Sequence, residues 1–273
     1  MTRIALLQMN SGIDPDANAA RIVAAANEAA GQGAAMLFTP EMSGLIDRDR
    51  NRARAHIVPE DQDRVLAAVR EAAARAGIWV ALGSTPVRRE AGRFANRAFA
   101  IDAAGAIAAR YDKIHMFDVD LATGESWRES NAYAPGEEVV TVQTPVGKLG
   151  LAICYDLRFP ALFEEFGKRR CDVISIPAAF TVPTGQAHWH VLQRARAIEA
   201  SAYVVCAAQV GLHDDGRATY GHSMVIDPWG QVQLDMGGDQ AALGFSEIDP
   251  ARIVEVRAQL PSLANKREIP RLA

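Results

Sequence analysis

Short apolar runs alternate with alanine-rich amphipathic segments through the first half of the chain. Apolar runs of this length are typical of buried strands, and spacings of three and four residues predict helices. Strands are therefore predicted at 3–9, 34–41, 78–85, 96–102 and 106–116, and helices at 16–33 and 63–77. Both predicted helices stop at glycine, which favours a helix end.

The second half repeats this order of elements. Strands are predicted at 148–156, 172–180, 202–209, 221–227 and 231–235, and helices at 159–170 and 187–201. "IDAAGAI" aligns with "IDPWGQV" at an offset of 125 residues, and "LFTPE" aligns with "ISIPA" at an offset of 137. Two similar strand–helix halves explain the alignment, although the element order common to all α/β chains is an alternative explanation.

The apolar strands constrain how such halves pack. They are too apolar to face water on either side, so each half is expected to form a sheet with helices on one face. Packing the two bare sheet faces together gives an α/β fold, a four-layer α-β-β-α sandwich with two pseudo-symmetric halves. We expect one domain over 1–260 and a tail over 261–273 that is disordered or lies at a subunit interface.

The chain lacks regular patterns over 43–60, 117–137 and 180–187, which carry charge, Gly and Pro. Segments of this kind between regular elements often carry function, so these three are candidate active-site loops.

Composition narrows the class of protein. The 273 residues carry a net charge of −4, which favours neither nucleic acid nor an anionic membrane as the main partner. No apolar run approaches the roughly 18–20 residues of a membrane span, and the N-terminus lacks the pattern of a signal peptide. Three cysteines without Cys-x-x-Cys spacing are typical of free thiols in a reducing compartment. We therefore expect a cytoplasmic protein.

Three chemically active groups follow predicted strands. Glu41 ends the second strand, Lys113 follows the "DAAG" turn and its strand, and Cys154 ends the first strand of the second half. Ligand sites in α/β sheets lie beyond the carboxyl ends of strands, so a carboxylate, an amine and a thiol could meet there. Taken singly, each has a plainer interpretation: a buried apolar cysteine, a surface glutamate and a solvated lysine.

The segments around these residues resemble a known family. "LFTPEMSG", "YDKIHMFDVD" and "GLAICYDLRFP" resemble, in order and spacing, the glutamate, lysine and cysteine motifs of the nitrilase, or carbon–nitrogen hydrolase, superfamily. "GQAHWHVLQRARAIEA" and "YGHSMVIDPWG" are similar to its Nit-type amidase branch, and the resemblance runs from Arg3 to about Leu260. It implies the α-β-β-α sandwich and a homodimer.

The resemblance also implies catalytic roles. Cys154 corresponds to the nucleophile, Glu41 to the general base and acid, and Lys113 to the group that stabilises the oxyanion. A second family glutamate corresponds to Glu129, six residues before Pro135. Other glutamates of this segment fit the motif less well: Glu125, Glu137 and Glu138.

The run after the cysteine bears on the substrate. "CYDLRFP" resembles amidases that cleave a non-peptide C–N bond in small α-keto acid amides, here deaminated glutathione, giving 2-oxoglutarate and cysteinylglycine. Arg158 is suited to clamp a carboxylate, although an ion pair with Asp156 or a glutamate is the alternative. Tyr155 would add a backbone N–H to the oxyanion site, and Phe180 and Thr184 would line the pocket. An ω-amidase acting on 2-oxoglutaramate and a catalytically silent interaction module with this fold remain the alternatives.

Neither a metal nor an organic cofactor is expected. His188 and His190 are two residues apart on a predicted helix and do not share a face. His213 and His222 flank a polar loop without further ligands at metal spacing. No glycine-rich nucleotide motif is present.

Overall fold

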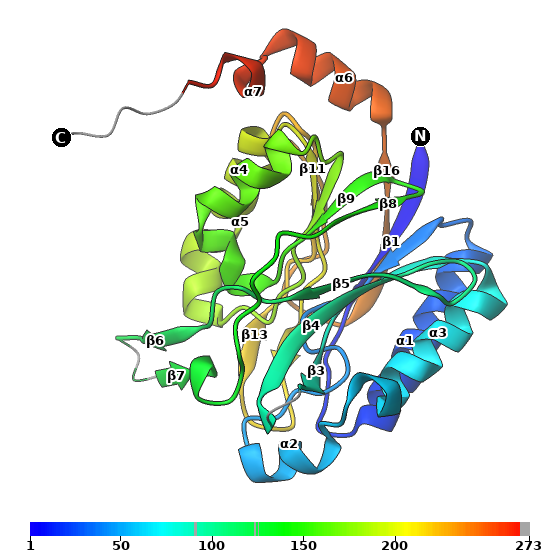
Figure 1. Cartoon of the computed structure of the whole chain (residues 1–273), viewed down its shortest axis with the longest axis vertical. Helices are drawn as coiled ribbons and strands as arrows, with labels where there is room; N and C mark the ends of the chain where they lie inside the picture. Colours follow the sequence, from blue (N-terminus) through cyan, green and yellow to red (C-terminus); the bar gives the residue numbers. More distant parts are fainter. Residues whose placement is uncertain (90–91, 123, 125, 268–273) are drawn as a thin grey trace.

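Two stacked sheets with helices on their outer sides make up the fold (Figure 1). The structure is a computed structural model, and it describes residues 1–89, 92–122, 124 and 126–267. The first sheet contains β1 (Thr2–Gln8), β2 (Met36–Phe38), β3 (Trp79–Arg88), β4 (Phe94–Ile101), β5 (Ile107–Asp112) and β16 (Ala242–Ile248). The second contains β8 (Thr141–Thr144), β9 (Gly147–Leu151), β10 (Val173–Ser175), β11 (Tyr203–Cys206), β14 (Met224–Ile226) and β15 (Val232–Asp235).

Helices and two short hairpins complete the described chain. The helices are α1 (Pro15–Gly31), α2 (Arg50–His56), α3 (Arg64–Ala76), α4 (Pro160–Lys168), α5 (Val182–Ala200), α6 (Pro250–Gln259) and α7 (Ser262–Asn265). The short 3-10 helices are η1 (Glu60–Gln62), η3 (Glu129–Asn131) and η4 (Cys154–Arg158). The hairpins pair β6 (Asp118–Asp120) with β7 (Ser126–Arg128), and β12 (Val210–Leu212) with β13 (Ala218–Tyr220).

The two sheets have the same topology. Their strand orders are β16-β1-β2-β3-β4-β5 and β8-β9-β10-β11-β14-β15. In each, the middle three strands are parallel and the flanking ones pair antiparallel. This correspondence confirms the two similar halves that the internal repeat predicted, and the α-β-β-α sandwich with them.

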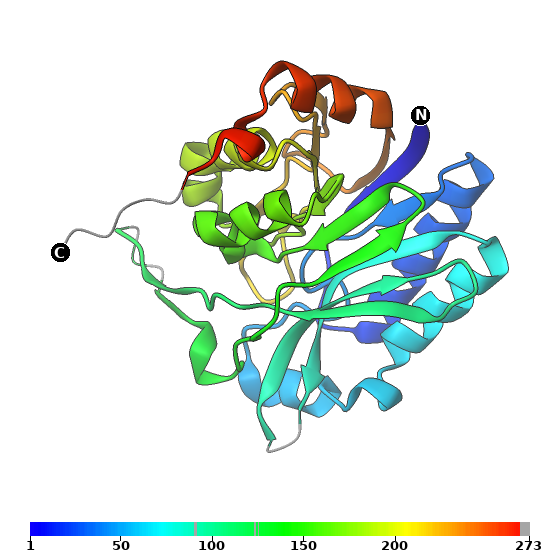
Figure 2. The same ribbon diagram turned by 45° about the horizontal axis from the view of Figure 1, so that its top comes forward.

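Alternation along the strands explains the layers. In β1, Ile4 and Leu6 belong to a core cluster that also contains Leu149 and Leu151 of the second sheet. The intervening Ala5 and the neighbouring Leu7 belong to a separate cluster with residues of α1 and α3. Because successive side chains point to opposite faces, each strand contributes to both cores. Figures 1 and 2 show α1 and α3 covering one side of the sandwich and α4 and α5 the other.

Four of the predicted segments need correction. The strand predicted at 148–156 ends at Leu151, and the chain then turns into η4. The segment 180–187 is not a loop, because α5 begins at Val182 with Pro183 in its first turn, where the missing N–H costs nothing. The segment 43–60 contains α2, whose N-cap is Asp49. The segment 117–137 contains the β6–β7 hairpin and η3.

The end of the described chain packs on the body of the protein. A side chain added at Gly167 would meet Leu263 of α7 at 2.7 Å, and Lys266 forms an ion pair with Glu164 of α4. Residues 268–273 of the predicted tail lie outside the described residues, so the boundary at residue 260 stays a prediction. None of the described helices combines the length and the apolar character needed to cross a membrane.

Candidate active site

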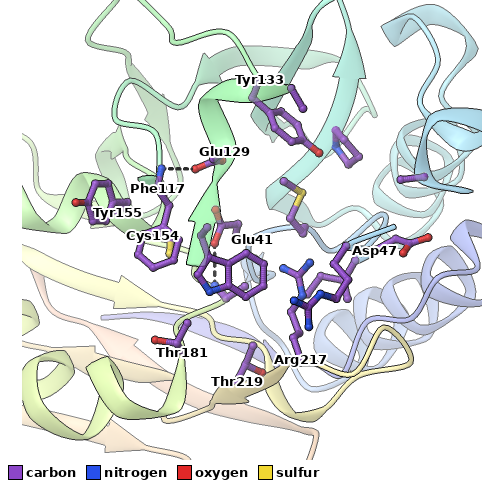
Figure 3. A pocket seen from close by; sticks show the side chains of 18 of the residues that line it. Glu41, Asp47, Phe117, Glu129, Tyr133, Cys154, Tyr155, Thr181, Arg217 and Thr219 are labelled. Atoms are coloured by element: carbon purple, nitrogen blue, oxygen red, sulfur yellow. Dashed lines mark hydrogen bonds between the residues drawn. The ribbon is translucent and has the colours of Figure 1, made fainter. Parts of the chain in front are cut away.

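The ends of three strands bring Glu41, Lys113 and Cys154 to one place. Glu41 lies three residues beyond β2, Lys113 directly follows β5, and Cys154 lies three residues beyond β9. The Nζ atom of Lys113 lies 3.0 Å from Oε1 of Glu41, and the Cys154 thiol lies next to the Glu41 carboxylate. Figure 3 shows Glu41 and Cys154 side by side at the wall of a cavity.

Glu129 is the second glutamate of the cluster. Its Oε2 atom lies 2.8 Å from Nζ of Lys113 and accepts the Phe117 N–H at 2.7 Å. Glu137 and Glu138 are exposed and do not line the cavity, while Glu125 lies outside the described residues. The geometry therefore favours Glu129 over its described neighbours.

Cys154 begins a turn that a buried carboxylate holds in place. Its φ is +47°, a left-handed conformation that costs a residue with a Cβ about 1 kcal/mol or more. The Cys154 N–H donates to the carbonyl of Pro177 at 2.9 Å. Asp156 accepts the Ile153 N–H at 2.9 Å, the Tyr111 hydroxyl at 2.7 Å and the His115 N–H at 3.0 Å. Asp156 thus ties the cysteine turn to the segment that carries Lys113.

Asn96 of β4 completes the cluster from the first sheet. Its Nδ2 donates to Oε1 of Glu41 at 2.9 Å and to Oε1 of Glu129 at 3.2 Å. Its Oδ1 atom is buried without a hydrogen-bond partner among the described residues. Sequence reasoning missed Asn96 and Asp156, because a single amide inside a strand and an aspartate in a turn carry no spacing signal of their own.

Close approach of the two sheets requires a glycine at the base of the site. A Cβ at Gly83 would lie 2.0 Å from the Thr39 carbonyl oxygen, 2.4 Å from that of Pro40 and 2.6 Å from Cβ of Pro177. No side chain fits there, because backbone cannot yield as a flexible side chain can. Gly83 therefore lets the strand ends of the two halves meet.

Burial and mutual attraction set the charges of the cluster. Burial raises the pKa of Glu41, but the Lys113 ammonium and hydrogen bonds from Cys154, Lys113 and the Ala179 N–H outweigh it, leaving that pKa below its usual value. Burial lowers the pKa of Lys113, but Glu129 and Glu41 raise it well above its usual value. Burial, followed by the Glu41 charge, raises the pKa of the Cys154 thiol well above its usual value. The resting site is a carboxylate, an ammonium and a neutral thiol.

A cavity of about 320 Å³ opens beside the cluster. Of the predicted substrate residues, Tyr155, Phe180 and Thr184 line it. Arg158 does not: its guanidinium lies over the rings of Tyr155, at 5.8 Å, and Phe180, at 5.3 Å, and contacts His188. Asp156, the alternative partner of Arg158, is instead bonded to Tyr111 and His115.

Four other arginines line the cavity, and sequence reasoning missed them. They are Arg48, Arg50, Arg128 and Arg217. The first two belong to the charged segment 43–60, which was predicted as an active-site loop. Arg48 lies in the loop before α2, Arg128 in β7 and Arg217 in the β12–β13 hairpin. Because these segments are far apart in the sequence, no single stretch of sequence contains all of them.

One group of side chains could hold a cation. His190, His222 and Asp235 offer ligand atoms that all lie within 4.8 Å of one another. His190 Nε2 and His222 Nδ1 each lie 2.9 Å from an Asp235 carboxylate oxygen. Hydrogen bonds from two imidazole rings to one shared carboxylate account for this geometry without a metal ion. The expectation that the protein needs no metal stays a prediction.

Comparison with known proteins extends the argument from the site to the whole chain. The carbon–nitrogen hydrolase family model matches residues 3–258. A deaminated glutathione amidase from Yersinia enterocolitica is 39% identical over 267 residues, which cover 97% of this chain and 92% of that protein.

Two solved structures are informative. The NitFhit protein of C. elegans superimposes with a TM-score of 0.89 at 36% identity, over 97% of this chain and 65% of that one. An amidase from Nesterenkonia, solved after acrylamide had added to its active-site cysteine, gives a TM-score of 0.77 at 25% identity, over 96% and 98%.

The four-layer sandwich, with its cavity at the strand ends of both halves, places the protein in the nitrilase fold class. The match over most of the chain makes this more specific: the protein belongs to the carbon–nitrogen hydrolase family. The resemblance noted in the sequence motifs is thereby confirmed.

Proposed function

We propose that this protein is a cysteine-dependent amidase that hydrolyses deaminated glutathione to 2-oxoglutarate and cysteinylglycine. The observation that carries the proposal is that Cys154, Glu41 and Lys113 line the same cavity. There the Lys113 Nζ atom lies 3.0 Å from the Glu41 carboxylate. A nucleophile within hydrogen-bond reach of a base that a third group orients is the arrangement of covalent catalysis. The amidase from Yersinia enterocolitica supports the choice of substrate.

In the first half-reaction, Sγ of Cys154 attacks the amide carbonyl while Glu41 takes the thiol proton. A base is needed because the raised pKa of Cys154 leaves little thiolate at neutral pH. The Lys113 ammonium, with the Tyr155 N–H, stabilises the tetrahedral oxyanion. Glu41 then gives its proton to the amine nitrogen, the C–N bond breaks, and an acyl thioester remains on Cys154.

In the second half-reaction, Glu41 takes a proton from water, and the hydroxide oxygen attacks the thioester carbonyl. The C–S bond breaks, and Glu41 returns the proton to the sulfur of Cys154. Glu129 does not exchange protons in this scheme. It orients Lys113 through the contact at 2.8 Å, while Asn96 positions both carboxylates.

Turnover of two substrates tests the proposal. We expect the wild-type enzyme to release 2-oxoglutarate from deaminated glutathione with a kcat/KM at least about tenfold above that for 2-oxoglutaramate. Only deaminated glutathione has a peptide leaving group that can contact the cavity in addition to the acyl part. A tenfold preference corresponds to about 1.4 kcal/mol of transition-state binding. A preference for 2-oxoglutaramate would keep the mechanism but make the protein an ω-amidase. No hydrolysis of these or of a wider set of amides would indicate a silent interaction module.

We also propose a homodimer that forms through α5. Among the described residues, Val191 and Ile198 on this helix are 69% and 43% exposed, and Trp229 is 49% exposed. A side chain at Gly230 would meet Ile198 at 2.7 Å, so the turn that carries Trp229 adjoins the helix. A second copy covering this apolar face fits the dimer that the sequence motifs implied.

Charge placed on this face tests the dimer. We expect sedimentation equilibrium to give a dimer for the wild type and a monomer for Val191→Glu/Ile198→Glu, because a buried unpaired carboxylate opposes association. Leu212→Glu is the matched control, since Leu212 is 72% exposed on β12 and is not one of the residues of the proposed interface. A monomeric wild type, or a double variant that stays dimeric, would reject the proposed interface.

The proposed location is the cytoplasm. Cys154, Cys171 and Cys206 are all free thiols. A thiol nucleophile requires reducing conditions to stay active, and reduced thiols persist in that compartment.

A further inference from the structure

Two cavity arginines share one aromatic ring. The guanidinium carbon of Arg48 lies 5.5 Å from the centre of the Trp127 ring, and that of Arg217 lies 4.9 Å from it. All three residues line the cavity. Stacking on an aromatic ring restrains a guanidinium while leaving its N–H edge open to an acceptor.

Asp215 accepts hydrogen bonds from both arginines. Its side chain is 0% exposed, and its Oδ2 atom accepts the Arg217 Nε–H and the Arg48 backbone N–H, each at 2.8 Å. The Asp215 carboxylate therefore sets the position of the Arg48 backbone and of the Arg217 side chain together. The β12–β13 hairpin and the loop before α2 meet at this residue.

The charges here do not cancel. Asp215 neutralises one of the two arginines, and the Arg48 guanidinium has no ion pair or hydrogen bond among the residues that the structure describes. The nearby Asp47 carboxylate is taken up by Arg52, which binds both its oxygens at 2.7 and 2.9 Å. One positive charge and the outer N–H groups of two guanidiniums thus remain for an anion.

The position of Arg48 and Arg217 relative to Glu41 and Cys154 indicates which part of a substrate contacts these arginines. In the proposed mechanism Glu41 protonates the departing amine, so the leaving group lies on the Glu41 side of Cys154. Figure 3 shows Arg217 and Asp47 beyond Glu41, while Tyr155 lies on the opposite side of Cys154. The acyl part of the substrate then extends toward Tyr155 and Phe180.

We propose that Arg48 and Arg217 form a subsite that binds a carboxylate on the amine leaving group. This inference rests on the proposed function and makes it more specific. The leaving group of deaminated glutathione, cysteinylglycine, ends in a carboxylate, whereas 2-oxoglutaramate releases ammonia. The subsite therefore selects amides whose amine portion is a short peptide acid.

Kinetics with two substrates test the subsite. In Arg48→Met and in Arg217→Met, we expect kcat/KM for deaminated glutathione to fall about 10- to 100-fold, mainly through KM, since a charged hydrogen bond to a carboxylate is lost. Activity on 2-oxoglutaramate should change less than about threefold. Arg54→Met is the matched control, because Arg54 is exposed on the same segment and does not line the cavity.

A modified substrate examines the same contact from the other side. Deaminated glutathione with its glycine carboxylate converted to the amide should lose a similar factor with the wild type and little more with either variant. Equal losses on both substrates, or no loss on deaminated glutathione, would overturn the subsite while leaving the amidase intact. A wild type that hydrolyses neither substrate would instead overturn the proposed function, and the subsite with it.

Discussion

Cys154→Ala is expected to lower kcat/KM on deaminated glutathione by about 10⁴- to 10⁶-fold, the range seen when a covalent nucleophile is removed. Alanine keeps the Cβ, so the turn at φ +47° and the Pro177 hydrogen bond are preserved. The variant should therefore fold and bind substrate. Single-turnover measurement of 2-oxoglutarate release, with mass spectrometry for the missing acyl-enzyme, checks the prediction.

The chain offers its own control for this experiment. Cys171 and Cys206 are fully buried in the core and do not line the cavity. Cys171→Ala removes a thiol without touching the site and should retain activity within about threefold. Iodoacetamide should label Cys154 before either of the others, because it alone borders the cavity. Substantial activity in Cys154→Ala would contradict the thioester mechanism.

The sequence predicts the architecture well where apolar strands repeat. The runs that became β1, β2 and β3, and their counterparts β9, β10 and β11, are buried on both faces and therefore stand out from their surroundings. Strand β16, with the sequence "ALGFSEI", was not predicted. It lies at the sheet edge and contains Gly, Ser and Glu, so neither an apolar run nor a clean alternation marks it.

The site was predicted as far as its residues follow strands or match motifs. Glu41 and Lys113 follow strands of the first sheet and Cys154 follows a strand of the second, so their places at strand ends could be predicted. Glu129 lies in η3, outside both sheets, and only the motif pointed to it. Arg158 illustrates the limit: its position in the chain was known, but the rings of Tyr155 and Phe180 decide where its side chain lies. Asn96 and Asp215 act through long-range contacts that only the tertiary fold creates.

Lys113→Met should be the most disruptive change outside the nucleophile. Lys113 is 2% exposed and is the shared partner of Glu41 and Glu129. Its loss leaves two carboxylates facing each other in a buried site, which costs about 3–5 kcal/mol of unfolding free energy. We also expect kcat to fall about 10²–10³-fold, because the proposed mechanism loses its main oxyanion donor. Urea unfolding at pH 8 and steady-state kinetics measure the two effects.

The pH dependence of the stability of Lys113→Met shows whether the loss is electrostatic or comes from lost packing of the lysine side chain. In the wild type, Lys113 holds the pKa of Glu41 below its unfolded value, so this carboxylate contributes stability at neutral pH that is lost on acidification. Without Lys113, the effect of burial on Glu41 is no longer opposed by the attraction of the ammonium group, which is the largest effect that lowers this pKa. The pKa of Glu41 then rises above its unfolded value. The deficit of Lys113→Met should then be largest near pH 8 and shrink as the pH falls toward about 5.

A second substitution provides the decisive comparison. In Lys113→Met/Glu41→Gln the carboxylate left unpaired is replaced by a neutral amide of the same shape, so stability at pH 8 should recover by about 2 kcal/mol or more. Activity should not recover, because the amide cannot accept the thiol proton. A deficit in Lys113→Met that is independent of pH and unchanged by Glu41→Gln would mean that Lys113 acts through packing of its alkyl chain. Recovery of stability without activity would instead establish that the buried lysine compensates the negative charge that the catalytic base requires.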